Sequence, residues 1–165
     1  MIEQRTSIEE FPDYEVSNLG HVFRVGTDHP MSISYTAHGH AKITLSDGRE
    51  RKTRSVALLV AQAFVEPPHP VCDHVMVLNG DHHDLRPENL VWRPRHFVWH
   101  YSRQFKVPTP LYCTTLPVEE VQTGRTWDNI VEASMACGLL MEDVWRSTYS
   151  GDPVFPLMTQ FRVIE

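Results

Sequence analysis

Residues 71 to 92, VCDHVMVLNGDHHDLRPENLVW, combine a carboxylate, an imidazole and an amide that together could hydrolyse a phosphodiester. Asp73 and His74 are adjacent at the edge of an apolar run, and strand alternation would point them to opposite faces, so we expect different roles for them. A carboxylate suits Mg²⁺ or a similar hard cation, whereas a neutral imidazole is a good general base at about pH 7. A further side chain must orient the imidazole, and Asn89 is the candidate.

The histidines inside this stretch receive a different interpretation. His82, His83 and Asp84 fall between its two halves, where a solvated loop touching the backbone of the phosphodiester substrate is favoured over metal binding. A zinc site built from Cys72 and these histidines is disfavoured, because no ligand pair has finger-like spacing. The three cysteines of the chain are odd in number and form no CxxC pair, so neither a disulfide framework nor a cysteine zinc site is expected.

Length and composition are those of a folded protein with one ordinary domain or a few small modules. The chain has 165 residues, of which 41% are hydrophobic. No apolar run approaches the roughly 20 residues that span a bilayer, and the first residues, MIEQRTSIEEF, lack the features of a signal peptide. The expected location is therefore the cytoplasm.

The charge distribution is uneven along the chain. The formal net charge of -6 argues against a generic nucleic-acid binder, which relies on Lys and Arg to neutralise phosphates. Residues 1–48 carry a net charge of -4, residues 49–106 of +3 and residues 107–165 of -5. The basic middle third contains the Asp-His stretch.

Two hairpins are predicted in the first third of the chain. Residues 8–24 read as two strands joined by a turn at residues 18–20, and residues 40–55 alternate through Ile43 and Leu45 toward a turn at residues 46–48. Residues 56–64 change to helical spacing, with Ser55 as a plausible cap. We then expect a strand over residues 71–78, which contains Asp73 and His74, and a helix that begins at Pro94.

Residues 107–117, with three prolines, are predicted to form an extended linker. Thr126 is expected to cap a helix over residues 127–136 that stops at Gly138, and a second helix should follow and end at Gly151. This spacing fits a helix-turn-helix, although only Arg146 on the second helix is basic. The alternative is a small two-helix packing or protein-contact unit closed by the strand FRVI.

Four motifs in order resemble the HNH nucleases, specifically the phage and intron-encoded HNH homing endonucleases. YEVSNLGHVF resembles their N-terminal module, LLVAQAFV their lead-in helix, DH...NGD...ENLVW their HNH core, and TGRTWDNIVEASMACGLL their appended helix-turn-helix. The resemblance implies an elongated α+β protein with an N-terminal antiparallel sheet and a ββα-metal core. The expected modules are an N-terminal sheet at 1–54, a nuclease core at 55–106, a linker at 107–117 and a helix-turn-helix at 118–165.

The resemblance also implies roles for single residues. Asp73 would be a ligand of one divalent cation, Mg²⁺ or Mn²⁺, His74 the general base, and Asn89 the residue that orients it. The family's last metal ligand falls here on Val98, which cannot bind a metal. His96 and His100 flank that position and are the candidate replacements, although a regular helix points each of them about 200° away from it.

Double-stranded DNA is the implied partner. Candidate phosphate contacts are the basic residues of the second hairpin and those around the Asp-His stretch, together with one on the second C-terminal helix: Arg49, Arg51, Lys52, Arg54, Arg86, Arg93, Arg95 and Arg146. The expected activity is DNA cleavage, with nicking favoured if the protein is a monomer, in a phage-infected bacterial host. The alternative is a weakened or inactive HNH-fold protein that binds DNA or a phage protein.

Overall fold

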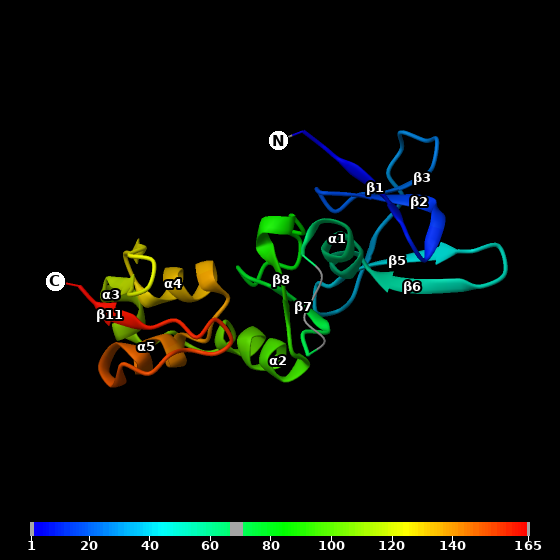
Figure 1. Ribbon diagram of the computed structural model, residues 1–165. Coiled ribbons are helices and arrows are strands. Elements are labelled where there is room, and N and C mark those ends of the chain that lie inside the picture. The colour runs from blue at the N-terminus through cyan, green and yellow to red at the C-terminus, as the bar shows by residue number, and fades with distance from the viewer. Residues whose placement is uncertain (1, 67–70, 165) are drawn as a thin grey trace. The chain divides into compact units, whose positions relative to one another are not determined.

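The computed structural model describes residues 2–66 and 71–164, and the chain divides into two compact units, one ending at Arg95 and the other beginning at His96. Figure 1 shows the elements of each unit. Short antiparallel sheets and helices make up both units, so the fold class is α+β. Across the described residues, no helix is long and apolar enough to cross a membrane.

Over residues 2–66 and 71–95, the first unit contains three small antiparallel sheets, one nine-residue α-helix and one short 3-10 helix. In chain order its elements are β1 Arg5–Ile8, β2 Phe11–Ser17, β3 Val22–Arg24, β4 Ser34–Tyr35, β5 Ala41–Ser46, β6 Arg51–Ser55, α1 Val56–Phe64, β7 His74–Val77, η1 Pro87–Asn89 and β8 Leu90–Arg93. Strands β1, β2 and β3 form one sheet, β4, β5 and β6 a second, and β7 and β8 a third. Both predicted hairpins are confirmed.

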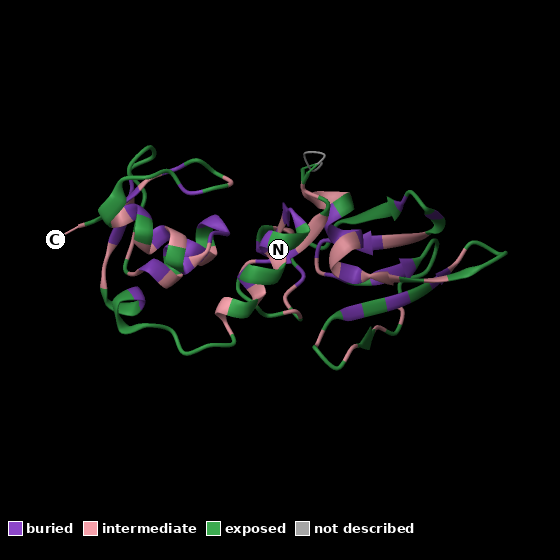
Figure 2. Cartoon of the chain, turned by 90° about the horizontal axis from the view of Figure 1, so that it is seen from below, coloured by how far each residue is buried: buried purple, intermediate pink, exposed green. Residues whose placement is uncertain are grey.

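Alternation of side chains explains how the second sheet meets the core. Ala41, Ile43 and Leu45 of β5 are buried, while the intervening residues of the strand are more exposed. The buried faces of the first two sheets and of α1 contribute to one apolar cluster, which β7 and β8 also join. Figure 2 shows buried segments running along these strands.

A tight turn brings the first hairpin against the loop that precedes β8. Gly20 has a φ of +83°, which favours glycine, and a Cβ built there would lie 2.9 Å from the Cβ of Leu85. Leu85 is itself buried in the cluster. Any larger side chain at Gly20 would therefore displace this loop.

Helix α1 begins and ends close to the predicted residues. Ser55 occupies the N-cap position, but its side chain makes no capping hydrogen bond. Val56, Leu59, Val60 and Ala61 are buried on the helix face that packs into the cluster. The predicted break after the helix, at EPPHP, lies largely outside the described residues.

The second unit has its own apolar core. Its elements are α2 Arg95–Gln104, which starts at the last residue of the first unit, α3 Leu111–Thr115, β9 Val118–Glu120, β10 Thr126–Trp127, α4 Ile130–Cys137, α5 Met141–Ser150 and β11 Phe161–Val163. Strand β9 lies between β10 and β11 in an antiparallel sheet. The predicted helix after Pro94 and the predicted closing strand are both confirmed.

The start of the first C-terminal helix was predicted wrongly. Residues 126–127 form strand β10, and α4 begins at Ile130 with Asn129 as its N-cap, whose side chain accepts a hydrogen bond from the Glu132 backbone N–H at 2.9 Å. Thr126 therefore caps nothing. Gly138, in the left-handed region at φ 62°, ends α4 as predicted.

The predicted linker is only partly extended. Residues 111–115 form the short helix α3, whose Cys113 is buried in the core of the second unit. Three prolines suggested an extended segment, but Pro110 occupies the N-cap of this helix and burial of Cys113 holds the helix against the core. Helices α4 and α5 pack together across the turn at residues 138–140. Their assignment as a helix-turn-helix stays a prediction.

Candidate functional site

The candidate site is built on the antiparallel pair of β7 and β8. The register places His74 opposite Arg93 and Val77 opposite Leu90. Val77 and Leu90 are buried in the first unit's core, which anchors the far end of the pair. The near end, where β7 starts, therefore presents His74 from a fixed strand.

Asp73 and His74 contact each other directly. The Nδ1 atom of His74 lies 2.9 Å from Oδ1 of Asp73. The expectation that the two side chains point to opposite faces is wrong, because β7 begins at His74 and Asp73 precedes the strand. With the proton on Nδ1, the ring donates to the carboxylate and leaves Nε2 as a proton acceptor.

The environment of Asp73 favours its ionised form. Its pKa lies below the ordinary value, first because of the hydrogen bond from His74 and also because the backbone N–H of Arg95 donates to it. Both side chains of the pair are substantially open to solvent. The arrangement resembles the carboxylate-histidine pairs in which a carboxylate fixes the ring and its tautomer.

Asn89 holds the loop between the two strands. Its Oδ1 accepts the backbone N–H of Asn79 at 3.0 Å, and its Nδ2 donates to Oδ1 of Asn79 at 3.0 Å and to the carbonyl of Asp84 at 2.7 Å. Asn89 is only 6% exposed. In the described chain its side-chain hydrogen bonds thus go to the loop, and orientation of His74 by Asn89 stays a prediction.

The same loop contains an ion pair between Arg86 and Asp84 that was not predicted from the sequence. Arg86 donates from Nε and a terminal nitrogen to the two carboxylate oxygens of Asp84, at 2.7 and 2.8 Å, and Asp84 also accepts from Asn79 at 3.1 Å. These contacts lower the pKa of Asp84, with the hydrogen bond from Arg86 as the largest cause, and raise the pKa of Arg86. The Asp-Leu-Arg spacing was the available signal.

The loop histidines touch the N-terminal sheet module. The rings of His82 and His40 are 4.1 Å apart between centroids, and those of His83 and Tyr35 are 4.8 Å apart. The sequence predicted a solvated loop here, and His83 is indeed exposed. The ring contacts add a role in joining the loop to residues 35–40.

The predicted phosphate contacts of the second hairpin fall into two groups. Lys52 and Arg54 both form ion pairs with Glu10. Arg49 and Arg51 are exposed, and within the described part of the chain their side chains form no ion pair. Only the second pair presents uncommitted charge.

The other predicted DNA contacts also differ in their surroundings. Arg93 is 8% exposed and donates to the Trp92 carbonyl at 3.0 Å, while Arg95 is exposed. Arg146 pairs with Glu142 at 3.2 Å and Asp143 at 3.4 Å. Arg93 is therefore the predicted contact that the strand register places nearest to His74.

The predicted metal ligands are divided between the two units. Asp73 belongs to the first unit, whereas His96 and His100, both exposed, belong to the second. Val98, at the departure from the family pattern, is partly buried on the same helix. Across residues 2–66 and 71–164, no three His, Cys, Asp or Glu side chains are grouped so that they could hold a metal ion. Their shared ligation stays a prediction.

Comparison with known proteins gives two matches. The chain is 29% identical over 83 residues, 50% of its length, to an uncharacterized HNH endonuclease of Acanthamoeba polyphaga mimivirus, and the matched segment covers 21% of that relative. The structure is similar to that of the HNH homing endonuclease I-HmuI, described for DNA binding and cleavage, with a TM-score of 0.56, 19% identity and 98% of both chains covered. No family model matches the chain. The fold is thus similar to that of an HNH homing endonuclease.

Proposed function

We propose that this protein is a metal-dependent HNH endonuclease that hydrolyses a DNA phosphodiester. The observation that carries the proposal is the contact between Asp73 and His74 at the start of β7, with Nδ1 and Oδ1 2.9 Å apart. The fold similarity and the HNH relative support the reaction class. The proposal extends to the homing type, with double-stranded DNA as the substrate.

In this mechanism His74 acts as the general base. Asp73 accepts the hydrogen bond from Nδ1, so the lone pair of Nε2 remains free to take a proton from the attacking water. The lowered pKa of Asp73 keeps its carboxylate ionised, so it can accept the hydrogen bond while His74 takes up a proton. Asn89 acts at one remove, since it fixes the loop that connects the two strands.

Asp73 also fits a hard divalent cation. One carboxylate oxygen accepts from His74, and the second retains lone pairs for a cation. Mg²⁺ typically binds through one or two carboxylates together with waters and substrate phosphates, so the small number of grouped protein ligands is compatible with it. When bound, such a cation neutralises charge on the phosphate and the leaving oxygen. Mg²⁺ or Mn²⁺ is the proposed ion, with His96 or His100 as a further ligand.

The basic side chains would position the DNA backbone. Arg93, the register partner of His74, and the exposed Arg95 are the proposed contacts for a phosphate beside the base. Arg49 and Arg51 are the hairpin residues with free charge for neighbouring phosphates. Lys52, Arg54, Arg86 and Arg146 must first exchange a carboxylate partner for a phosphate, and we expect smaller contributions from them.

A second function has its own support. Val98 stands where the family pattern has a metal ligand. This observation favours a catalytically weakened HNH-fold protein that binds DNA or a phage protein. Calorimetry with Mn²⁺ separates the two functions, because the endonuclease must bind the ion and the alternative need not.

The test is incubation of the protein with supercoiled plasmid and Mg²⁺ or Mn²⁺. The wild type should convert the plasmid to nicked or linear forms, chelation should stop the reaction, and His74→Ala should slow it by about 10²-fold or more because a general base contributes about 10²- to 10⁴-fold. His29→Ala, an exposed histidine with no role in the proposed mechanism or in DNA contact, is the matched control. An inactive wild type, or equal rates for both variants, would refute the proposal.

A further inference from the structure

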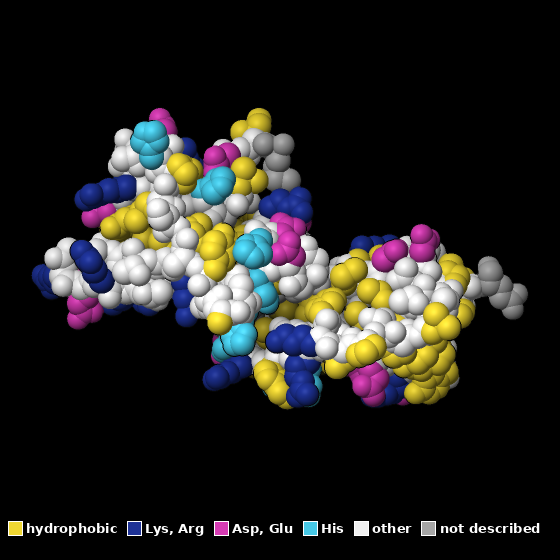
Figure 3. Space-filling view, turned by 180° about the vertical axis from the view of Figure 1, so that it is seen from behind, with side chains coloured by type: hydrophobic (Ala, Val, Ile, Leu, Met, Phe, Trp, Pro, Cys, Tyr) yellow, Lys and Arg dark blue, Asp and Glu magenta, His cyan; other side chains and the backbone are white. Residues whose placement is uncertain are grey.

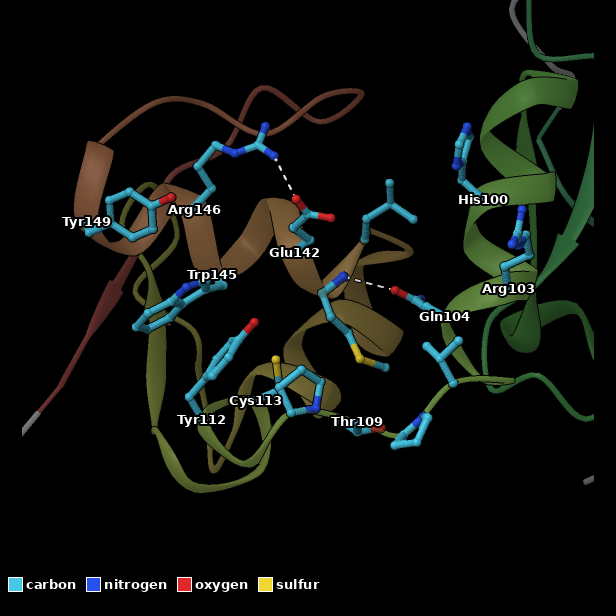
Figure 4. A pocket seen from close by; sticks show the side chains of 15 residues that line it. His100, Arg103, Gln104, Thr109, Tyr112, Cys113, Glu142, Trp145, Arg146 and Tyr149 are labelled. Atoms are coloured by element: carbon cyan, nitrogen blue, oxygen red, sulfur yellow. Dashed lines mark hydrogen bonds and ion pairs between the residues drawn. The ribbon is translucent and has the colours of Figure 1, made fainter.

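A hollow lies within the second unit, away from the Asp-His pair in the sequence. It is bounded by the end of α2, residues 107–110, α3 and α5, and its volume is about 540 Å³. This volume is in the usual range for small-molecule pockets, roughly 300 to 1,000 Å³. Figure 4 shows its lining, with aromatic side chains from α3 and α5 on one side and His100 and Arg103 on the other.

The aromatic side of the hollow is a row of three rings. Tyr112 and Trp145 have centroids 4.7 Å apart with planes tilted by 35°, and Trp145 and Tyr149 have centroids 5.7 Å apart at 63°. Tyr149 is 68% exposed and Tyr112 is 38% exposed, so neither ring is covered by the core of the unit. The outer rings therefore offer flat apolar surface to an occupant.

Further apolar surface is exposed around this row. Val107 is 57% exposed and Leu111 is 77% exposed, and both are close in sequence to Tyr112. Figure 3 shows hydrophobic side chains gathered over the C-terminal part of the chain. Contiguous exposed apolar surface of this kind marks binding sites more often than isolated apolar residues do.

The opposite side of the hollow is cationic. Arg103 lies in the last turn of α2, and its guanidinium carbon is 4.5 Å from the centroid of the exposed Trp99 ring. Within residues 2–66 and 71–164, Arg103 forms no ion pair, whereas Arg146 is held by Glu142 and Asp143. Glu142 and Arg146 both line the hollow and pair with each other at 3.2 Å, so among the described residues the unpaired positive charge of the lining is that of Arg103, across the hollow from the aromatic row.

The remaining groups of the hollow do not suggest a reaction. Cys113 lines it, but burial raises the pKa of its thiol, so it remains protonated and unreactive at neutral pH. The amide oxygen of Gln104, Oε1, accepts a hydrogen bond from the backbone N–H of Met141 at 2.9 Å. The hollow has the properties of a binding site, because its flat apolar side faces the positive charge of Arg103.

We propose that this hollow binds an unpaired stretch of DNA, with a base stacked on the Trp145–Tyr149 face and an adjoining phosphate at Arg103. Nucleobases stack on aromatic side chains in a sequence-tolerant way, and a guanidinium matches a phosphate. The free positive charge beside exposed rings is complementary to an anionic aromatic ligand. This inference rests on the proposed function, since it makes DNA the ligand of the second unit.

The test is fluorescence anisotropy with a labelled oligothymidylate of eight nucleotides and the full-length protein. Tyr149→Ala should weaken binding about tenfold or more, and Tyr149→Phe should restore it, because stacking requires the ring and not the hydroxyl. Arg103→Gln should also weaken binding and reduce the slope of log affinity against log salt by about 0.7, the value for one single-strand phosphate contact.

Arg125→Gln is the matched control, because Arg125 also lies over a tryptophan ring of this unit, that of Trp127 at 5.2 Å, but does not line the hollow. It should bind as the wild type does. No oligonucleotide binding, equal binding by Tyr149→Ala, or capture of a proline-rich peptide in place of the oligonucleotide would overturn the inference.

His74→Ala separates this inference from the proposed function. It should bind the oligonucleotide normally while failing to cut plasmid. If the wild type binds the oligonucleotide through Tyr149 but never cuts plasmid, the proposed cleavage fails and the hollow's role stands. If it cuts plasmid but Tyr149→Ala binds the oligonucleotide normally, only the inference fails.

Discussion

At the scale of single residues, the buried side chain of Asn89 fixes the loop between β7 and β8. Its side chain makes three hydrogen bonds to Asn79 and Asp84, all within the loop between β7 and β8. The backbone N–H of Asn79 and the carbonyl of Asp84 would lose these partners if Asn89 were truncated. The loop then has fewer contacts that fix it.

Asn89→Ala should lower the free energy of unfolding by about 2 kcal/mol, because buried polar partners are left unsatisfied. Urea denaturation monitored by circular dichroism measures the change. His29→Ala, at an exposed position outside this loop, should stay within about 0.5 kcal/mol of the wild type. If Asn89→Ala also lowered the free energy of unfolding by less than about 0.5 kcal/mol, the loop would not depend on this amide.

Asp84 should make stability depend on pH at the acid end. Its pKa is lowered from the ordinary 3.8, so its hydrogen bonds with Arg86 stabilise the fold fully above pH 3.8 and are lost as the pH falls through the lower folded-state pKa. Asp84→Asn should therefore destabilise the protein at pH 7 and by less at pH 2. Urea midpoints at the two pH values provide the measurement, and an equal loss at both would contradict the expected linkage.

Residue types were enough to select Asp73 and His74 as candidates, but they did not predict the contacts of these side chains. Asp73 and His74 could be identified from adjacent residue types, and their direct hydrogen bond could not, because it depends on where β7 begins. The ion pairs of Lys52 and Arg54 with Glu10 were equally hidden, since Glu10 lies far away in the sequence. Long-range contacts are fixed by packing and leave little local signal.

At the scale of elements, α4 shows where local reasoning about caps fails. Thr126 and Asn129 are both acceptable N-cap types, and pairing of β10 with β9 takes Thr126 into a strand. Asn129 then caps the helix through Glu132, three residues later. Pairing of β10 with β9 therefore determines where α4 begins.

Asn129→Ala should reduce the free energy of unfolding by about 1 kcal/mol through loss of the cap. Thr126→Ala, which removes the candidate suggested by sequence alone, should change it by about half of that or less because Thr126 is exposed. Thermal unfolding of the two variants in parallel provides the comparison. A larger effect at Thr126 would reverse the assignment.

At the scale of the whole molecule, the chain contains two apolar cores with separate membership. Leu45 belongs to the core of the first unit and Leu139 to that of the second, and both are fully buried. The four expected modules were drawn from motifs, whereas the structural division falls at Arg95, the first residue of α2. Motif order does not reveal which residues share a core.

Leu45→Ala and Leu139→Ala should each cost about 2 to 5 kcal/mol, but in different parts of the chain. Hydrogen exchange followed by mass spectrometry should show faster exchange up to Arg95 in the first variant and from His96 onward in the second. Faster exchange throughout the chain in either variant would show that the two units unfold together.

The central claim is that Asp73 holds a divalent cation while His74 remains free as the base. Anomalous scattering from Mn²⁺ in crystals of the protein with DNA tests it most directly. We predict a Mn²⁺ peak in coordination distance of an Asp73 carboxylate oxygen, with Nε2 of His74 directed at the scissile phosphate and not bonded to the ion. A peak on His74 Nε2, or a bound DNA with no Mn²⁺ beside Asp73, would contradict the account.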